Sequence, residues 1–431
     1  MSSPQFQQSV SSVAPKSLLR RKLTGFWTMI LLMGPGIITS NVDNDAGGIT
    51  TYSLAGAEYG LTMLWTLIPI TLILIVIQEM GARMGVVTGK GLSDLIRERF
   101  GIKVTFYTMI LLIATNLGNT LSEFAGIAAS LELFGISRYI SVPFSMLFLF
   151  WLAVKGTYSF IEKVFLSACV FYVAYVIVGF LVQPDWGEVV EAVTTPSIKW
   201  EPPFLVMLAG LVGTTIAPWM QFYLQASIVD KGLQEKDLPA ARIDVVVGSI
   251  VVSVVAFFII LACAATLYKA GVKIEQASEA ALALEPLAGK YCTWLFAFGL
   301  FNASMFSAAI LPISTSYTVC EAFGWESSLD KKFSEAPQFY GLYCFIILFS
   351  GLLILAPNLP LVSIMYVSQV INGLVLPIVL IFMVILISDR SIMLQHANGV
   401  IMNIVSWGFV GLLSILSILT LAFSLKELFG W

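Results

Sequence analysis

The stretch GPGIITSNVDNDAGGITT, residues 34–51, decides how this chain must fold. It lies in a hydrophobic segment long enough to span a membrane, yet it contains Asp43, Asn44 and Asp45 followed by two glycines. A carboxylate inside a bilayer is costly and a glycine weakens a helix by about 1 kcal/mol, so both features require compensation. The stretch therefore predicts a helix that breaks near its middle and holds a cation there.

The composition is that of a polytopic helical membrane protein. Of the 431 residues, 58% are hydrophobic and 11% are charged, and the mean hydropathy is +0.90, which leaves too little polar surface to cover a soluble globule. The net charge of -3 gives no reason to expect nucleic acid as a partner. The five cysteines lie singly in apolar runs, as small buried hydrophobic residues do. Neither a Walker motif nor a GxSxG sequence nor a nucleophile–base pair is found, so nothing indicates an ATPase or a hydrolase.

Eleven apolar windows, bounded by charge, proline or glycine, predict eleven transmembrane helices. The windows cover residues 25–59, 62–82, 104–134, 138–155, 159–182, 203–229, 243–269, 291–320, 337–356, 360–387 and 400–425. The main loops are expected at residues 83–103, 183–202, 230–242 and 321–336.

The basic residues predict the orientation in the membrane. Most of the 23 Lys and Arg residues fall on the side that carries the N-terminus, so this terminus is expected in the cytoplasm. An odd number of spans then places the C-terminus outside. The polar, Ser-rich residues 1–23 are expected to be a cytoplasmic tail rather than a removed signal peptide. We expect an integral protein of a bacterial inner membrane, surrounded by the lipid bilayer, with no obligatory protein partner.

The sixth span repeats the anomaly of the first. Its apolar run is interrupted at GTTIAPW, residues 213–219, where Pro218 removes a backbone donor and Gly213 loosens the helix. Matched breaks five helices apart predict two five-helix repeats of inverted topology. The two repeats and the extra last helix are expected over residues 24–182, 203–387 and 400–431. The alternative is a simple proline kink in the sixth span, which is common in membrane helices.

Unwinding at the two breaks would free backbone carbonyls that bind a cation together with a carboxylate. We expect Asp45 to be the acidic ligand, and Val42 and Thr214, just before the breaks, to supply carbonyl oxygens. Asp43 is expected to point elsewhere, toward the vestibule through which the ion enters. The alternative, surface carboxylates at a helix end, fits poorly with acids well inside an apolar segment.

Every candidate ligand around the breaks offers oxygen, as a carboxylate, a carbonyl, a hydroxyl or an amide. The amides are those of Asn44, Gln221, Gln225 and Gln369. Such donors suit hard cations, Mg2+, Mn2+ or Ca2+, over Zn2+ or Cu+. Gln369, in the tenth span, could reach the ion directly or through water, or could hydrogen-bond a neighbouring helix instead.

A polar face is predicted on the third span. Asn116, Asn119 and Glu123 lie at spacings of three and four residues and therefore share one side of the helix. Two interpretations stay open for this face: hydrogen bonding between helices, or the lining of an aqueous pathway.

Motifs along essentially the whole chain resemble those of the Nramp family of transition-metal transporters. They are GPG…DNDAGG, ARMGVVTGKGLSDLIRERFG, LSEFAGIAASLELFG, APWMQFYLQAS and SQVINGLVLP. The family carries Asp-Pro-Gly-Asn in its first span and Met-Pro-His in its sixth. The resemblance implies a LeuT-like fold that binds the metal between two unwound segments.

The chain departs from this family at the positions that hold the metal. Asp45 matches the aspartate of the motif, but Gly48 replaces the ligating asparagine and Ala217 replaces the metal-selective methionine. The family's acidic pair implicated in proton transfer falls on Asn116 and Asn119. The pattern resembles a branch of Nramp-related magnesium transporters, which are thought to carry Mg2+, and Mn2+ as well, without proton coupling.

Each departure has a physical consequence. Without the thioether, the site loses the soft ligand that favours transition metals. The smaller side chains leave room for Mg2+, which usually keeps several of its waters, and Gln369 would then bind through water. Loss of the family's histidines and acidic pair removes the titratable groups that a proton symporter uses.

The sequence therefore predicts a transporter, not an enzyme, that imports hydrated Mg2+, and Mn2+ as well, by alternating access as a uniporter. The metal is the transported substrate and no cofactor is expected. One alternative is a proton-coupled Mn2+ or Fe2+ transporter of the same family. Another is a sodium-coupled carrier of amino acids or other organic solutes with this architecture. A membrane sensor or scaffold would need a soluble effector domain, and none is visible.

Overall fold

The computed structural model describes residues 44–155, 172–326 and 333–429. Over these residues the chain is helical and contains no β-strand, as the sequence predicts. A described helix falls in each of the eleven predicted spans. By length and composition alone, eight stretches of the described chain are apolar enough to cross a membrane.

The helices of the bundle, in chain order, are α3 (Ala46–Tyr59), α4 (Leu67–Thr88), α5 (Leu92–Glu132), α6 (Arg138–Lys155), α8 (Val173–Leu181), α10 (Pro202–Thr215), α11 (Pro218–Asp230), α12 (Leu238–Cys263), α15 (Cys292–Phe323), α16 (Pro337–Ile354), α17 (Leu361–Ser388) and α19 (Val400–Phe429). The shorter helices between them are α9 (Trp186–Thr194), α13 (Ala277–Ala281), α14 (Glu285–Ala288) and α18 (Arg390–Met393).

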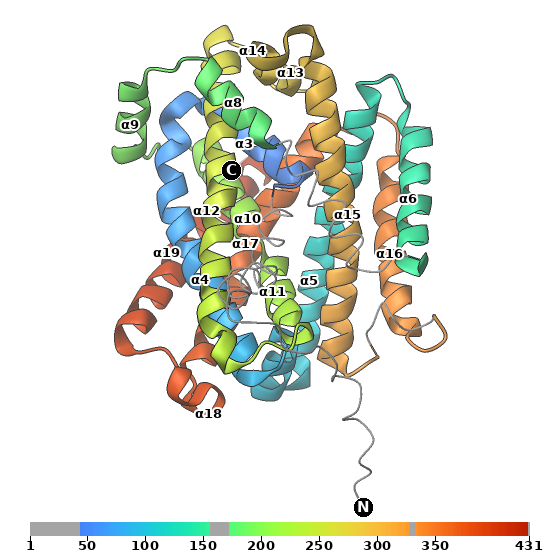
Figure 1. Ribbon diagram of the computed structural model, residues 1–431, viewed down its shortest axis with the longest axis vertical. Helices are drawn as coiled ribbons and strands as arrows, with labels where there is room; N and C mark the ends of the chain where they lie inside the picture. Colours follow the sequence, from blue (N-terminus) through green and yellow to red (C-terminus); the bar gives the residue numbers. More distant parts are fainter. Residues whose placement is uncertain (1–43, 156–171, 327–332, 430–431) are drawn as a thin grey trace, which may run out of the picture.

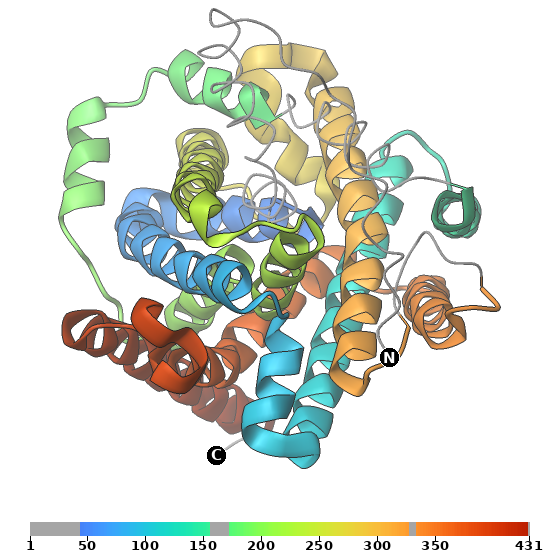
Figure 2. The same cartoon turned by 60° about the horizontal axis from the view of Figure 1, so that its bottom comes forward.

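Helix α3 and the two helices of the sixth span lie inside the bundle. Figure 1 shows α3, α10 and α17 near its middle, with α6 and α16 together at one edge and α9 at the other. Helix α17 packs against α10, α5 and α3, and α5 packs along α15 (Figure 2). The ends of α3 and α10 are therefore shielded from lipid by other helices.

The outer surface of the bundle is apolar. On α6 the side chains of Ile140, Phe144 and Leu147 are each about two-thirds exposed, and Ile401 and Ile404 on α19 are exposed as well. An exposed apolar surface of this extent is expected where a protein faces lipid rather than water. The four cysteines of the described chain, Cys263 among them, are free thiols, in line with their prediction as small hydrophobic residues.

The charged stretch 83–103 is helical, and the prediction of a loop there is wrong. Helix α4 continues to Thr88 and α5 begins at Leu92, so only a short turn separates them. The glycine at position 101, with φ 80° and ψ 170°, interrupts α5 shortly after it starts. The charges are accommodated by ion pairs on the surface, such as Lys90 with Glu98 at 2.6 Å, rather than by an irregular loop. The predicted loop at 183–202 likewise contains a helix, α9.

The sixth span is two helices rather than one kinked helix. Helix α10 ends at Thr215, and Ile216 (φ -131°, ψ 63°) and Ala217 (φ -69°, ψ 143°) leave helical geometry. Pro218 then starts α11 at a position where its missing N–H costs nothing. The predicted break is confirmed here, and the simple kink is excluded.

Candidate functional site

Asp45 is the residue that starts α3, the helix that follows the predicted first break. Its backbone is extended (φ -73°, ψ -172°), and its Oδ1 accepts a hydrogen bond from the N–H of Gly48 at 2.6 Å. This is the geometry of a helix N-cap, where exposed N–H groups and the helix dipole favour a negative charge. Only 5% of Asp45 is exposed, so the sequence correctly places a buried carboxylate at the start of α3.

A second carboxylate meets the first. Glu123 on α5 is completely buried, and its Oε2 accepts a hydrogen bond from the N–H of Ala46 at 3.3 Å. Ala46 directly follows Asp45, so this bond brings the Glu123 carboxylate next to the Asp45 cap at the start of α3. Two buried carboxylates this near to one another are stabilised by a shared proton or by a cation between them, because two bare negative charges would repel. This pair is therefore the strongest cation-attracting feature at the breaks.

The predicted set of ion ligands did not include Glu123. Its spacing from Asn116 and Asn119 predicted a polar face, but not which helix each residue meets. In the structure Asn116 donates to Thr315 on α15 at 2.7 Å, and Asn119 pairs with Asn372 on α17. These two residues make hydrogen bonds between helices, which is one of the two open interpretations.

A titratable side chain thus stays beside Asp45. The departures from the family suggested that the carboxyl groups used by a proton symporter are lost at Asn116 and Asn119. The structure corrects this inference, because Glu123 lies one helical turn further along α5 and reaches the start of α3.

The second break contributes small and oxygen-bearing residues. Thr214 and Ala217 are both 2% exposed. Ala217 caps α11 without a side-chain hydrogen bond, and its carbonyl accepts from Gln221 Nε2 at 3.4 Å. Helices α3 and α10 are joined directly by a 2.8 Å hydrogen bond between the hydroxyls of Tyr52 and Thr215.

Gln369 of α17 lies against both broken spans. A Cβ on Gly47 would sit 1.8 Å from Gln369 Nε2, and a Cβ on Gly213 would sit 2.0 Å from the backbone oxygen of Gln369. The absence of side chains at both glycines is what allows this approach. The structure therefore brings the predicted residue Gln369 to both breaks, and its role as a ligand stays a prediction.

Several buried oxygens around the breaks have no hydrogen-bond partner among the described residues. They are Asn44 Oδ1, Thr51 Oγ1, Glu123 Oε1, Thr214 Oγ1 and Gln221 Oε1. Buried polar atoms without partners are uncommon and call for an explanation such as an ion or water. The predicted residues Val42 and Asp43 lie outside the described residues.

The donors at the breaks are mainly oxygen. Met365 on α17 is a sulfur close to α3, and its Sδ accepts a hydrogen bond from the hydroxyl of Thr50 at 3.5 Å. In the part of the chain that the structure describes, no three His, Cys, Asp or Glu side chains cluster as a metal site. Two carboxylates supplemented by hydroxyl, amide and carbonyl oxygens suit a hard divalent cation.

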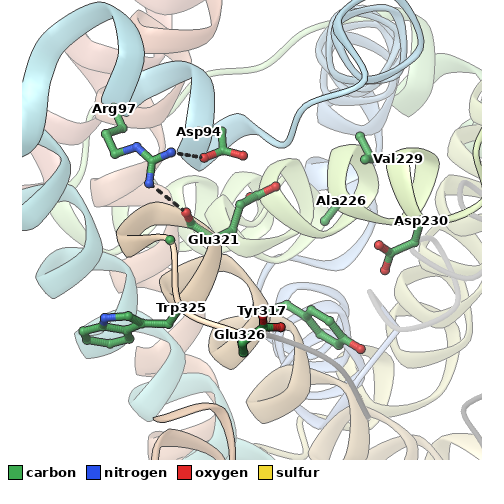
Figure 3. Close-up of a pocket in the computed structure, with 10 residues that line it drawn as sticks. Asp94, Arg97, Ala226, Val229, Asp230, Tyr317, Glu321, Trp325 and Glu326 are labelled. Atoms are coloured by element: carbon green, nitrogen blue, oxygen red, sulfur yellow. Dashed lines mark hydrogen bonds and ion pairs between the residues drawn. The ribbon is translucent and has the colours of Figure 1, made fainter. Parts of the chain in front are cut away.

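A polar cavity of about 360 Å³ opens where the N-terminal part of α5 meets the C-terminal parts of α11 and α15 (Figure 3). Asp94, Asp230 and Glu321 line it together with Arg97. Arg97 donates to Asp94 Oδ1 at 2.8 Å and to the Glu321 backbone oxygen at 3.3 Å, and the Glu321 carboxylate accepts from Ser93. The acids outnumber the base, so the wall attracts cations.

Comparison with known proteins places these features in a family context. The profile of the family described as natural resistance-associated macrophage protein-like, Nramp, matches residues 36–423. The divalent metal cation transporter MntH of Bacillus subtilis is 24% identical over 415 residues, which cover 93% of this chain and 94% of that protein. The MntH of Caldanaerobacter subterraneus is 25% identical over 411 residues, covering 91% and 93%.

Solved structures give the same fold. The manganese transporter of Eremococcus coleocola, in complex with an aromatic bis-isothiourea compound, superposes with a TM-score of 0.77 at 20% identity, covering 99% of this chain and 92% of that chain. MhsT in complex with L-phenylalanine matches with a TM-score of 0.55 at 14% identity, covering 91% and 98%. At these identities the matches establish the architecture alone, which is the predicted LeuT-like fold.

Proposed function

This chain belongs to the Nramp family, and on that premise we propose that it carries a hard divalent cation, Mg2+ foremost and Mn2+ as well, across the membrane by alternating access. The observation that supports this most is that two buried acids, Asp45 and Glu123, meet at the start of α3, where each accepts a backbone N–H. One divalent cation neutralises this pair completely, whereas a monovalent ion leaves a buried charge.

The ligand chemistry supports a hard ion. We propose Asp45 as the charged ligand, with carbonyl oxygens from Val42 and Thr214. Gly48 and Ala217 contribute by being small. Since no thioether stands at position 217, a transition metal gains nothing over Mg2+ from a soft ligand. The room left by the two small residues suits an ion that keeps part of its water shell.

Two further predicted residues have separate roles in this proposal. Asn44 is 1% exposed and its backbone oxygen accepts from the Tyr172 hydroxyl at 2.6 Å, which fixes the chain just before Asp45. Its side-chain oxygen, without a partner in the described chain, is a candidate ligand. Asp43 is proposed to face the vestibule through which the ion enters.

The membrane potential can drive such transport without a second ion. Moving two charges across 100 mV corresponds to about 4.6 kcal/mol, from about 2.3 kcal/mol per charge. We propose a bacterial plasma-membrane protein with its N-terminus inside. The acidic cavity of Asp94, Asp230 and Glu321 then lies on the cytoplasmic side and receives the ion as it leaves the site.

A specific observation also favours a second candidate, a proton-coupled Mn2+ transporter. Glu123 provides a buried carboxyl group beside Asp45, and such a group can take up a proton when the metal leaves. The relatives named for divalent metal or manganese transport are consistent with this candidate.

Flux measurements on the purified protein in liposomes separate the candidates. Vesicles loaded with a Mg2+-sensitive dye and a pH dye are given external Mg2+ and an inside-negative potential. The uniporter predicts Mg2+ entry with no acidification, whereas a proton symporter predicts that the lumen acidifies with the metal. Uptake of Cd2+ or Fe2+ without any Mg2+ entry would contradict the proposal.

A further inference from the structure

Three buried amides form a chain from α5 to the first break. Asn119 Nδ2 donates to Asn372 Oδ1 at 3.1 Å, and Asn372 Nδ2 donates back to Asn119 Oδ1 at 2.8 Å. Asn372 Nδ2 also donates to Gln369 Oε1 at 2.9 Å. All three side chains are 1% exposed. The chain therefore runs from the scaffold helix α5, through α17, to the glutamine that touches Gly47.

The neighbours of Gln369 fix how its amide is oriented. The Ser368 hydroxyl donates its only hydrogen to the Met365 backbone oxygen at 2.8 Å, so toward Gln369 it can only accept, which places the Gln369 NH2 group on that side. An asparagine amide has two N–H donors, and both donors of Asn372 are used, one on Asn119 and one on Gln369. The Gln369 oxygen is thus turned toward Asn372, and its NH2 group lies against Gly47 and within 3.4 Å of the hydroxyl of Ser368. At the break, Gln369 presents hydrogen-bond donors rather than an oxygen.

We infer that Asn372, held by Asn119, is a positioning residue that turns the Gln369 carbonyl oxygen away from the cation and so disfavours ions that shed their water. This inference rests on the proposed function, because it concerns which ion the site prefers. A carbonyl oxygen replaces a water in the inner shell of a cation, and an NH2 group cannot. Mg2+ gives up water reluctantly, so it loses least when that oxygen is withheld.

The chain of three amides consists of neutral groups. Hydrogen-bonded amides between helices are tolerated in a membrane interior, where charged groups are far more costly. One turn earlier on the same face of α5, Asn116 donates its hydrogen bond to Thr315 on α15, away from the amides of α17. Asn116 is therefore the matched control: the same residue type, on the same helix, with a similar burial of 1%.

The test compares uptake KM values for Mg2+ and Mn2+ in proteoliposomes. Asn372→Leu frees the Gln369 oxygen and is expected to shift the KM ratio about tenfold in favour of Mn2+. Asn119→Leu is expected to give a smaller shift in the same direction, and Asn116→Leu no shift. Combining Asn119→Leu with Asn372→Leu leaves no orphaned partner between the two helices, so this double variant is expected to fold and to show the full shift.

A Gln369→Leu background separates positioning from general damage. If Asn372 acts through Gln369, then Asn372→Leu changes the KM ratio no further when Gln369 is already replaced. An undiminished shift in that background, or equal changes in both KM values, would overturn the inference.

The Mg2+ flux of the wild type is measured first. This order allows a failure of the proposed transport function to be distinguished from a failure of the positioning role of Asn372. Absence of Mg2+ uptake by the wild type overturns the proposed function alone. The positioning role is then tested with the Mn2+ KM, which Asn372→Leu lowers only when Gln369 is present. A Mn2+ KM that stays unchanged in Asn372→Leu overturns the positioning role.

Discussion

The carboxylate of Glu123 accepts a hydrogen bond at 3.3 Å from the backbone N–H of Ala46, the first residue of the helix that follows the first break. This bond links the third span to the broken first span. It also places a second acid beside Asp45, the residue before Ala46. The acidic pair of the site therefore comes from two helices, although the sequence predicted only the acid of the first span as a ligand.

Replacing Glu123 by glutamine keeps an acceptor for Ala46 and removes the charge. If the acid helps to hold a divalent cation, Glu123→Gln is expected to raise the KM for Mg2+ by roughly tenfold or more, as for the loss of a charged hydrogen-bond partner. Uptake in liposomes measures this. The control is Glu132→Gln at the end of the same helix, where the acid pairs with Arg138 at 2.6 Å. Equal KM values for Mg2+ in the two variants would show that Glu123 does not help to bind the ion.

The two glycines that pack against Gln369, Gly47 and Gly213, are expected to differ in how well they tolerate substitution by alanine. A Cβ on Gly213 meets backbone atoms of Gln369 and Gly373, which cannot move aside, so Gly213→Ala is expected to abolish transport and lower the yield of folded protein. A Cβ on Gly47 meets the flexible end of Gln369, so Gly47→Ala is expected to fold. Gly118→Ala, with open space around the added carbon, is the control. Thermal unfolding in detergent and uptake measure both effects, and equal tolerance at the two positions would be inconsistent with the packing.

The Tyr52–Thr215 hydrogen bond is expected to couple the two broken spans energetically. Tyr52→Phe should lower the free energy of unfolding by about 1 kcal/mol, the usual contribution of one hydrogen bond. Thr215→Val should lower it further, because the Thr215 hydroxyl also donates to the Leu211 backbone oxygen at 2.8 Å. Because both changes remove the same bond, the double variant should lose less than the two single effects added together. Strict additivity would show that the two hydroxyls act independently.

Ion selectivity is expected to change when the methionine and asparagine of the family motif are restored at positions 217 and 48. Ala217→Met together with Gly48→Asn restores a soft ligand and an amide and reduces the space for water. We expect this double variant to prefer Mn2+ or Cd2+ over Mg2+, by about tenfold for each added inner-shell ligand. Competition between Mg2+ and Cd2+ in uptake measures the shift. Unchanged selectivity would mean that these two positions do not face the ion.

The second break, the start of α3 after Asp45 and the spans could be predicted from the sequence because their signals are local. Asp45 is a polar residue in an apolar window, and Pro218 cannot continue a helix, so both positions are visible without a partner. The prediction of a loop at residues 83–103 was wrong, because a high density of charged residues is also found in surface helices. Here the charges form ion pairs such as that of Lys90 with Glu98.

The partners at the site could not be predicted, because they depend on how helices distant in sequence pack. The spacing of Asn119 and Glu123 indicated one shared face, but their partners lie on different helices, at Asn372 and at Ala46. Likewise, the sequence predicted only that Gly47 weakens the helix. The packing of α17 against α3 shows that this glycine also makes room for the Gln369 side chain.

The most direct measurement is Mg2+ uptake by Asp45→Asn compared with Asp185→Asn. Both residues are helix N-caps that accept backbone N–H bonds, at 2.6 Å for Asp45 and 2.8 Å for Asp185, and asparagine caps a helix nearly as well. Only Asp45 is placed at the breaks. A binding site for a divalent cation at Asp45 predicts that Asp45→Asn abolishes uptake while Asp185→Asn transports like the wild type. Wild-type uptake by a folded Asp45→Asn protein would contradict it.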